Sequence, residues 1–276
     1  MDGSTPPGEV ALLVAALLGA GFATGLLAGL LGIGGGSILV PVLYETFGSI
    51  GVDDVVRMHL AVGTSLAVIA PTSLRSYAGH RARGAVDMDL VRSMALPVVA
   101  GVVLGAVLAR YSDAAVLQGI WVVAASLISL KLFLGGQDWR LGDAIPGQPF
   151  RAIYGGCVGL LSAMMSIGGG VFITALMTFY GHPMQRAVGT SSAFGPIIAI
   201  PGVLGFAWAG WHAAGLPPGS LGYVSLLGAL LIIPTSVLAA PLGVRIAHGI
   251  SRRKLELAFA TFLAVVGVRF LISLFD

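Results

Sequence analysis

Two glycine clusters are the places where this otherwise apolar chain could bind a charged ligand. They lie in "LLGIGGGSILVPVL" at 30–43 and in "MMSIGGGVFITAL" at 164–176. Three glycines in a row weaken a helix, and the apolar segments that follow are too short to cross a bilayer. A short helix that starts at such a break has free N–H groups and a positive dipole end, which attract an anion. The predicted site comprises Gly34, Gly35, Gly36, Ser37, Ser166, Gly168, Gly169 and Gly170. The alternative is that the glycines only allow two helices to approach closely.

A second repeated string adds hydroxyl groups to this prediction. "AVGTS" at 61–65 returns letter for letter at 187–191, so the two halves carry Thr64 with Ser65 and Thr190 with Ser191. We interpret these hydroxyls as hydrogen-bond donors to substrate oxygens. The alternative is that they bond back to their own helix backbone, as Ser and Thr often do in membrane helices.

Polar residues just before these strings extend the candidate site. His59 aligns with Gln185 as a symmetric polar pair, and Arg186 follows Gln185. His59 is either a proton-responsive group or an interface residue. Arg186 either binds substrate or sets the orientation of the chain in the membrane.

Other site classes lack their sequence signals. The glycine strings are not followed by the Gly-Lys-Ser/Thr of a phosphate-binding loop, and neither AVGTS serine lies in a Gly-x-Ser-x-Gly string. Glu45 is the only acidic residue well inside a predicted apolar segment, so a dedicated metal site is not expected. No basic tract with interleaved aromatic residues points to nucleic acid. We therefore expect a protein that is not an enzyme, with no catalytic residues, cofactor or metal.

The elements that must position these groups are membrane helices. Hydrophobic residues make up 57% of the 276 residues and charged residues only 10%, whereas soluble domains carry about a quarter charged residues. This composition predicts an all-α integral membrane protein. The apolar segments are 9–31, 37–48, 58–78, 89–109, 112–134, 151–166, 170–180, 187–209, 219–243 and 254–274.

The order of the motifs predicts two related halves. A first membrane repeat spans 9–134, a polar linker spans 135–150, and a second repeat spans 151–274. Twelve of the fifteen Lys and Arg residues fall on one side if the linker is cytoplasmic, as the positive-inside rule requires. The hairpin at 9–48 then enters from outside and the hairpin at 151–180 from inside, so the repeats are inverted and both termini are extracytoplasmic. Each repeat consists of one broken-helix hairpin and three membrane helices, an organisation typical of transporters.

The motifs also resemble those of a known family. "GIGGGSILVPVL" at 32–43, "AVGTSL" at 61–66, "SLRSYAGHRARGAVD" at 73–87, "SIGGG" at 166–170 and "AVGTSS" at 187–192 resemble the sulfite exporter TauE/SafE family, also called the TSUP permeases. The resemblance covers residues 9 to 274. It implies export or uptake of sulfur-containing anions, namely sulfite, sulfoacetate, other organosulfonates and thiosulfate, across a prokaryotic plasma membrane.

Together these observations predict a secondary transporter, an exporter, of a small sulfur oxyanion or sulfonate that works by alternating access. The lipid bilayer is its other partner, and the sequence leaves its oligomeric state open. The alternative within transport is a passive channel or uniporter for another small anion.

Overall fold

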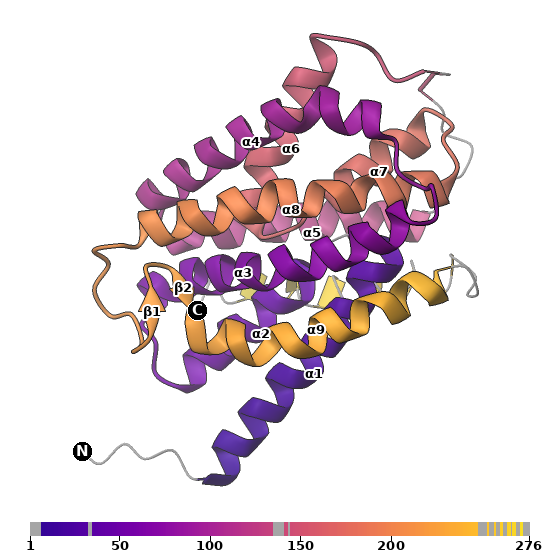
Figure 1. Ribbon diagram of the computed structural model, residues 1–276. Coiled ribbons are helices and arrows are strands. Elements are labelled where there is room, and N and C mark those ends of the chain that lie inside the picture. The colour runs from indigo at the N-terminus through magenta and orange to yellow at the C-terminus, as the bar shows by residue number, and fades with distance from the viewer. Residues whose placement is uncertain are drawn as a thin grey trace.

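The protein is described here from a computed structural model in which helices make up most of the chain (Figure 1). The structure describes residues 7–32, 35–134, 141–142 and 144–247, with isolated positions between 253 and 272. Gly34, residues 135–140 and 143 of the predicted linker, and most of the predicted last segment lie outside the described residues.

The described residues of the first half form five helices that match the predicted apolar segments within about four residues. Their bounds are α1 Pro7–Leu31, α2 Gly36–Ser49, α3 Asp54–Arg81, α4 Met88–Tyr111 and α5 Ala114–Leu134. Aspartates cap α3 and α4: Asp53 accepts from the Val55 N–H at 2.9 Å, and Asp87 accepts from the Leu90 N–H at 3.1 Å. Both helices therefore begin where a side chain satisfies a first-turn donor.

The second half repeats this order of long and short helices. Its elements are α6 Phe150–Met165, α7 Gly170–Phe179, α8 Met184–Ala209, β1 Ser220–Leu221, β2 Val224–Ser225 and α9 Leu226–Ile246. The strands form a small antiparallel hairpin with Ser220 opposite Ser225. The predicted helix at 219–243 is thus wrong at its start. Gly219 and Gly222 adopt positive φ, which a helix cannot accommodate, and Ser225 caps α9 at Leu226.

In the part of the chain that the structure describes, five helices are long and apolar enough to cross a membrane: α1 from Ala11, α3, α4, α8 from Gln185, and α9. The shorter apolar helices include α6 and α7. This confirms the all-α membrane architecture, to which the structure adds the small β-hairpin.

The first helix of each half packs along the last long helix described for the other half or its counterpart: α1 along α9, and α6 along α4. Helices α3 and α8 pack against each other at the centre. Helix α2 contacts α3, as α7 contacts α8. In Figure 1, β1 and β2 lie at one end of the bundle and the α3–α4 connection at the opposite end. Each half therefore supplies partners for the other rather than forming its own compact unit.

Glycines allow the close approach in both of the equivalent pairs. A Cβ on Gly25 would overlap the Ser236 backbone of α9, and a Cβ on Gly159 would overlap the Val98 carbonyl of α4. Membrane helices associate through such small residues because lipid provides no hydrophobic driving force between them.

Candidate functional site

Both glycine strings break the helix, and they do so in the same way. Gly32 and Gly35 adopt positive φ of 66° and 73° in the first break. Ser166 and Gly169, at the matching positions of the second string, adopt 52° and 69°. Left-handed conformations end a right-handed helix, and a second helix starts after each of them. The predicted breaks are thus confirmed, and Ser166 is the one non-glycine residue with positive φ among the described residues.

The helices that start at the breaks have uncapped N-termini inside the protein. Gly35 precedes α2 and Gly169 precedes α7, and neither residue has a side chain that could accept a first-turn N–H. Gly36, Ser37 and Gly170, which begin the two helices, are buried. Helix N-termini normally satisfy these donors with side chains or water. Here no side chain caps either helix, and both positive helix ends lie inside the protein.

Three buried hydroxyls without a protein partner lie in or beside the breaks: those of Ser37, Ser162 and Ser166. Among the described residues, the hydroxyls of Ser65, Thr174 and Ser220 also have no hydrogen-bond partner. Ser37, Ser162 and Ser166 are at most 1% exposed. Ser37 is in the first turn of α2, and a Cβ on Gly169 would lie 3.7 Å from Ser162 Oγ. A buried hydroxyl without a partner is costly, so this cluster indicates a polar occupant.

The two breaks touch each other. A Cβ added to Gly36 would overlap the carbonyl oxygen of Ser166 and would lie 2.8 Å from Ile69 Cδ1. On the other side of the first break, Ser191 Oγ is 2.9 Å from the Val188 carbonyl and 3.4 Å from the Gly32 carbonyl. In Figure 1, α2 lies toward the end that holds β1 and β2, and α7 toward the other end. The positive ends of both helices therefore meet where the breaks meet.

The first AVGTS string holds a loop of the second half. Thr64 Oγ1 accepts a hydrogen bond from the backbone N–H of Ser225 at 2.9 Å. Gly63 lies so close to the Tyr223 carbonyl that a Cβ would overlap it. Gly63 thus lets the backbone of the β1–β2 hairpin approach α3 closely, and Thr64 forms a hydrogen bond with it.

The second AVGTS string makes the reciprocal contact with the first half. Thr190 Oγ1 accepts from the backbone N–H of Asp87 at 2.9 Å, and a Cβ on Gly189 would overlap the Ala85 carbonyl. We call these two contacts, Thr64–Ser225 and Thr190–Asp87, the cross-half clamps. The first clamp fixes Ser225, which caps α9, and the second fixes Asp87, which caps α4. Both threonines therefore have structural partners in addition to any ligand.

An ion pair reinforces the second clamp. Arg186 donates to the Asp87 carboxylate at 2.7 Å, with side-chain exposures of 52% and 17%. Burial opposes ionisation of Asp87, but hydrogen bonds from the Leu90 N–H and Arg186, together with the charge of Arg186, lower its pKa below the usual value. Arg186 therefore serves the clamp, in a position where the first half has Leu60.

His59 and Gln185 are not brought together. His59 Nε2 donates toward the carbonyls of Ala109 at 3.0 Å and Ser112 at 3.1 Å, and its ring stacks on Tyr223 at 4.8 Å. His59 thus binds the carbonyls at the C-terminal end of α4. Gln185 is exposed at the start of α8.

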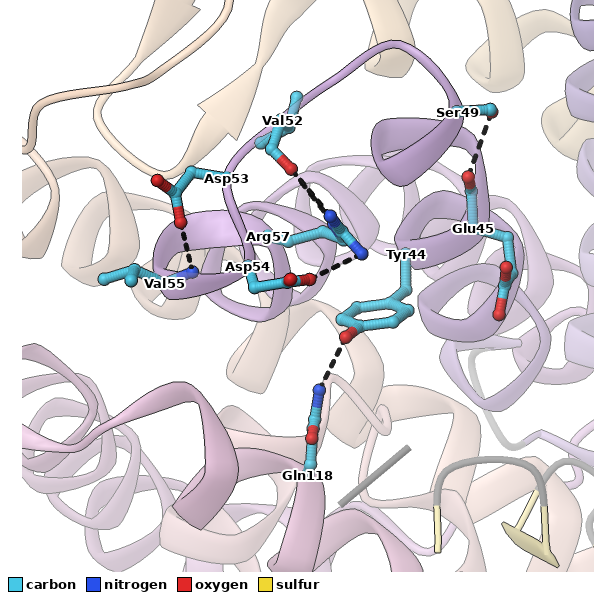
Figure 2. A network of polar contacts seen from close by, with 9 residues as sticks. All are labelled: Tyr44, Glu45, Ser49, Val52, Asp53, Asp54, Val55, Arg57 and Gln118. Carbon is cyan, nitrogen blue, oxygen red and sulfur yellow. Dashed lines mark hydrogen bonds and ion pairs between the residues drawn. The ribbon is translucent and has the colours of Figure 1, made fainter. Parts of the chain in front are cut away.

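A polar network anchors the C-terminal part of α2 (Figure 2). Arg57 pairs with Asp54 at 2.6 Å and donates to the Val52 carbonyl at 2.9 Å. Tyr44 lies beneath the Arg57 guanidinium and accepts from Gln118 of α5 at 2.8 Å. The network ties α2 to α3 and α5, so the short helix is held at the end opposite its open N-terminus.

The interior around the breaks carries almost no formal charge. Of the residues whose side chains the structure describes, no Lys, Arg, Asp or Glu is buried. His59 and His80 are the buried histidines of this part of the chain. The described residues contain no cluster of His, Cys, Asp and Glu that could hold a metal ion. The chemistry available at the breaks is hydrogen bonding by hydroxyls and helix N–H groups.

Comparison with known proteins identifies the family of this chain. Residues 17–270 match the family described as "Sulfite exporter TauE/SafE". The chain belongs to the TauE/SafE family. It is 30% identical to a probable membrane transporter protein of Haemophilus influenzae over 93% of this chain and 97% of that one. It is 28% identical to a probable membrane transporter protein of Methanocaldococcus jannaschii, over 94% and 96% of the two chains. No solved structure matches it.

The TauE/SafE family and the named relatives make this chain a multi-pass membrane transporter rather than an enzyme. In this TauE/SafE protein, the sequence did not point to Ser162, which lies in the last turn of α6, four residues before the left-handed Ser166 that ends the helix. It also missed Asp87, although this residue ends the "RARGAVD" string. A serine four residues from a predicted site residue on a helix was the available signal.

Proposed function

We propose that this protein is a secondary transporter, an exporter, of small sulfur-containing anions such as sulfite or organosulfonates, working by alternating access. The observation that carries the proposal is the meeting of two buried, uncapped helix N-termini with unpartnered hydroxyls. The first-turn N–H groups of α2 and α7 would hold the anion, and Ser37, Ser65, Ser162 and Ser166 would donate further hydrogen bonds. This donor set suits a small oxyanion because several oxygens can each receive a donor at once.

We further propose that residues 9–134 and 151–274 are inverted repeats, joined by a cytoplasmic linker at 135–150. The matching φ angles of the breaks and the exchanged helix pairs support this assignment. Inverted repeats place a substrate site at their interface and let it face either side of the membrane when the halves rock. Both termini would then be extracytoplasmic, in a prokaryotic plasma membrane.

Flux in liposomes tests the transport proposal. The purified protein should move sulfite or a small sulfonate, and a proton or ion gradient should drive accumulation of the anion. Absence of flux for every sulfur oxyanion and sulfonate tested would refute it. Flux that never exceeds equilibration under any gradient would instead support the passive channel or uniporter.

Cysteine accessibility tests the inverted arrangement. In a Cys157→Ser background, single cysteines at Gly84 and Gly215 should react with a charged, impermeant thiol reagent from opposite sides of the membrane. A Cβ on Gly84 would meet nothing within 4 Å and one on Gly215 only Asp53 Cβ at 3.9 Å, so the new side chains add no clash, and the positive φ costs each variant about 1–2 kcal/mol. Labelling of both from one side would contradict the proposed topology.

A further inference from the structure

We propose that the two cross-half clamps are the gates of the transport cycle. The Thr64–Ser225 contact closes one end of the path to the breaks, and the Thr190–Asp87 contact closes the other. This inference rests on the proposed function and deepens it, because it names the contacts that must part for the site to face each side of the membrane. The repeated threonines then serve the movement of the halves as well as their packing.

The clamps lie at opposite ends of the central helix pair. Helices α3 and α8 run antiparallel, because a Cβ on Gly63 would lie 3.1 Å from Phe206 Cβ and one on Gly195 would overlap Ser73 Cβ. The two clamp threonines lie at or beyond these contacts, about 20 Å apart along the helix axes at about 1.5 Å per residue. Figure 1 shows the same opposition, with β1 and β2 at one end and the α3–α4 connection at the other.

The breaks contact the middle of this helix pair. A Cβ on Gly36, which begins α2, would lie 2.8 Å from Ile69 Cδ1 of α3, and Gly169, which precedes α7, packs against Ile198 of α8. Ile69 comes five residues after the first clamp threonine, and Ile198 comes eight residues after the second. A ligand at the breaks therefore lies between the two clamps.

Both clamps are closed in the structure. Their hydrogen bonds are each 2.9 Å long, and Ser37, Ser162 and Ser166, which lie in or beside the breaks, are at most 1% exposed. The structure therefore describes a form in which the breaks are closed to both sides. Alternating access requires one end to open while the other stays closed, so a contact between the halves must part at each end in turn.

The composition of the clamps allows them to part. Each joins a hydroxyl to one backbone N–H, and water can bond both groups when the contact opens. Gly63 and Gly189 present no side chain to the partner backbone, so no interlocked side chains have to separate there. Pro71 in α3 and Pro196 in α8 each lack the N–H that would continue the helix hydrogen bonds, so each helix can bend inward of its clamp threonine.

Cysteine cross-links that lock one clamp at a time test the gates. At the hairpin end, a Cβ on Gly228 would lie 3.4 Å from Thr64 Cγ2, so Thr64→Cys with Gly228→Cys can form a disulfide. At the other end, Arg186 and Asp87 pair at 2.7 Å, so Arg186→Cys with Asp87→Cys can be bridged by a short bifunctional methanethiosulfonate. Both pairs are made in the full-length protein with Cys157→Ser.

Each lock should reduce the flux of sulfite or methanesulfonate in liposomes to that of empty vesicles, and a reductant should restore it. A clamp that never opens would transport equally well when cross-linked, because the lock only fixes a contact that is already made. Arg92→Cys with Asp89→Cys is the matched control for the bridging reagent. The native side chains of this pair are exposed, lie 3.9 Å apart within α4 and do not join the halves, so the cross-link should leave flux unchanged.

A second measurement needs no cysteines and decides the case in which a reduced cysteine pair does not transport. Thr64→Val and Thr190→Val each remove one acceptor, so each gate should open about twofold to tenfold more often. In the double variant both gates are then open together about fourfold to a hundredfold more often, and the anion leaks back. The double variant should accumulate less anion under a proton or ion gradient than either single variant, whereas Thr64→Ser with Thr190→Ser should accumulate it as the native protein does. Loss of folded protein alone would slow uptake without lowering its final level.

The outcomes separate the gates from the transport proposal. Full flux through either locked pair overturns the gates and leaves the transporter intact. A double valine variant that accumulates as much anion as the single variants has the same consequence. No flux of either anion through the native protein refutes the proposed function itself.

Discussion

The contact between the two breaks makes Gly36→Ala the most informative single substitution. A Cβ at this position would overlap the Ser166 carbonyl, a backbone atom that cannot rotate away, so the breaks must separate. Overpacking costs about 1–3 kcal/mol, offset by the 0.5–1 kcal/mol that alanine gains over glycine in a helix. Separation would also remove at least one of the proposed N–H bonds to the anion, about 1.5–3 kcal/mol, and so weaken affinity about tenfold to a hundredfold. Concentration-dependent flux of a sulfonate in liposomes measures this change.

Gly19→Ala is the matched control for this prediction. Gly19 is a helical glycine of α1, and a Cβ there would meet nothing within 4 Å. The control should therefore keep native affinity and gain slightly in thermal stability. If Gly36→Ala transports with the affinity of Gly19→Ala while both insert equally well, the anion does not bind between the breaks, and the glycines serve only helix packing.

Three further perturbations test the surroundings of the site. Thr190→Val removes the acceptor of the Asp87 N–H and should destabilise the protein by about 1–3 kcal/mol in detergent unfolding, whereas Thr190→Ser should not; equal melting of the two variants would contradict the clamp. Asp87→Asn removes only the charge. Because the pKa of Asp87 is lowered on folding, the wild type should be the more stable, by at most about 1 kcal/mol, above about pH 4, and the difference should vanish as the pH falls through the folded pKa; a difference that grows in acid would refute this. Gly51→Ala tests positive φ in open space and should cost about 1–2 kcal/mol, whereas Gly35→Ala also meets Thr24 and should cost more; equal losses would contradict the close contact.

Local chemistry explains what the sequence predicted well. Apolar runs of membrane length set the long helices, and three adjacent glycines were enough to place both breaks. The short segments after the breaks became α2 and α7 within about a residue of their predicted bounds. These features depend on residues that are neighbours in the chain, and for this reason they could be read from it.

The partners of the repeated threonines could not be read in this way. Thr64 bonds Ser225 and Thr190 bonds Asp87, contacts that span 161 and 103 residues. No periodicity reports such a pairing, so the sequence predicts these hydroxyls either as a substrate lining or as bonded to their own helix backbone, and neither prediction names these partners. The role of His59 was hidden for the same reason, because its acceptors lie 50 and 53 residues away at the end of α4.

The exchange of helix partners also sets the order in which the chain can mature during synthesis. Helix α1 is made first, yet the helix it packs along, α9, is made near the end of the described chain. Helix α4 likewise waits for α6. When only the first half has been synthesised, the glycine-bearing faces of its inserted helices are therefore still exposed to lipid. Insertion and assembly must be separate events in this protein, and a truncated chain would reach the membrane without reaching its native packing.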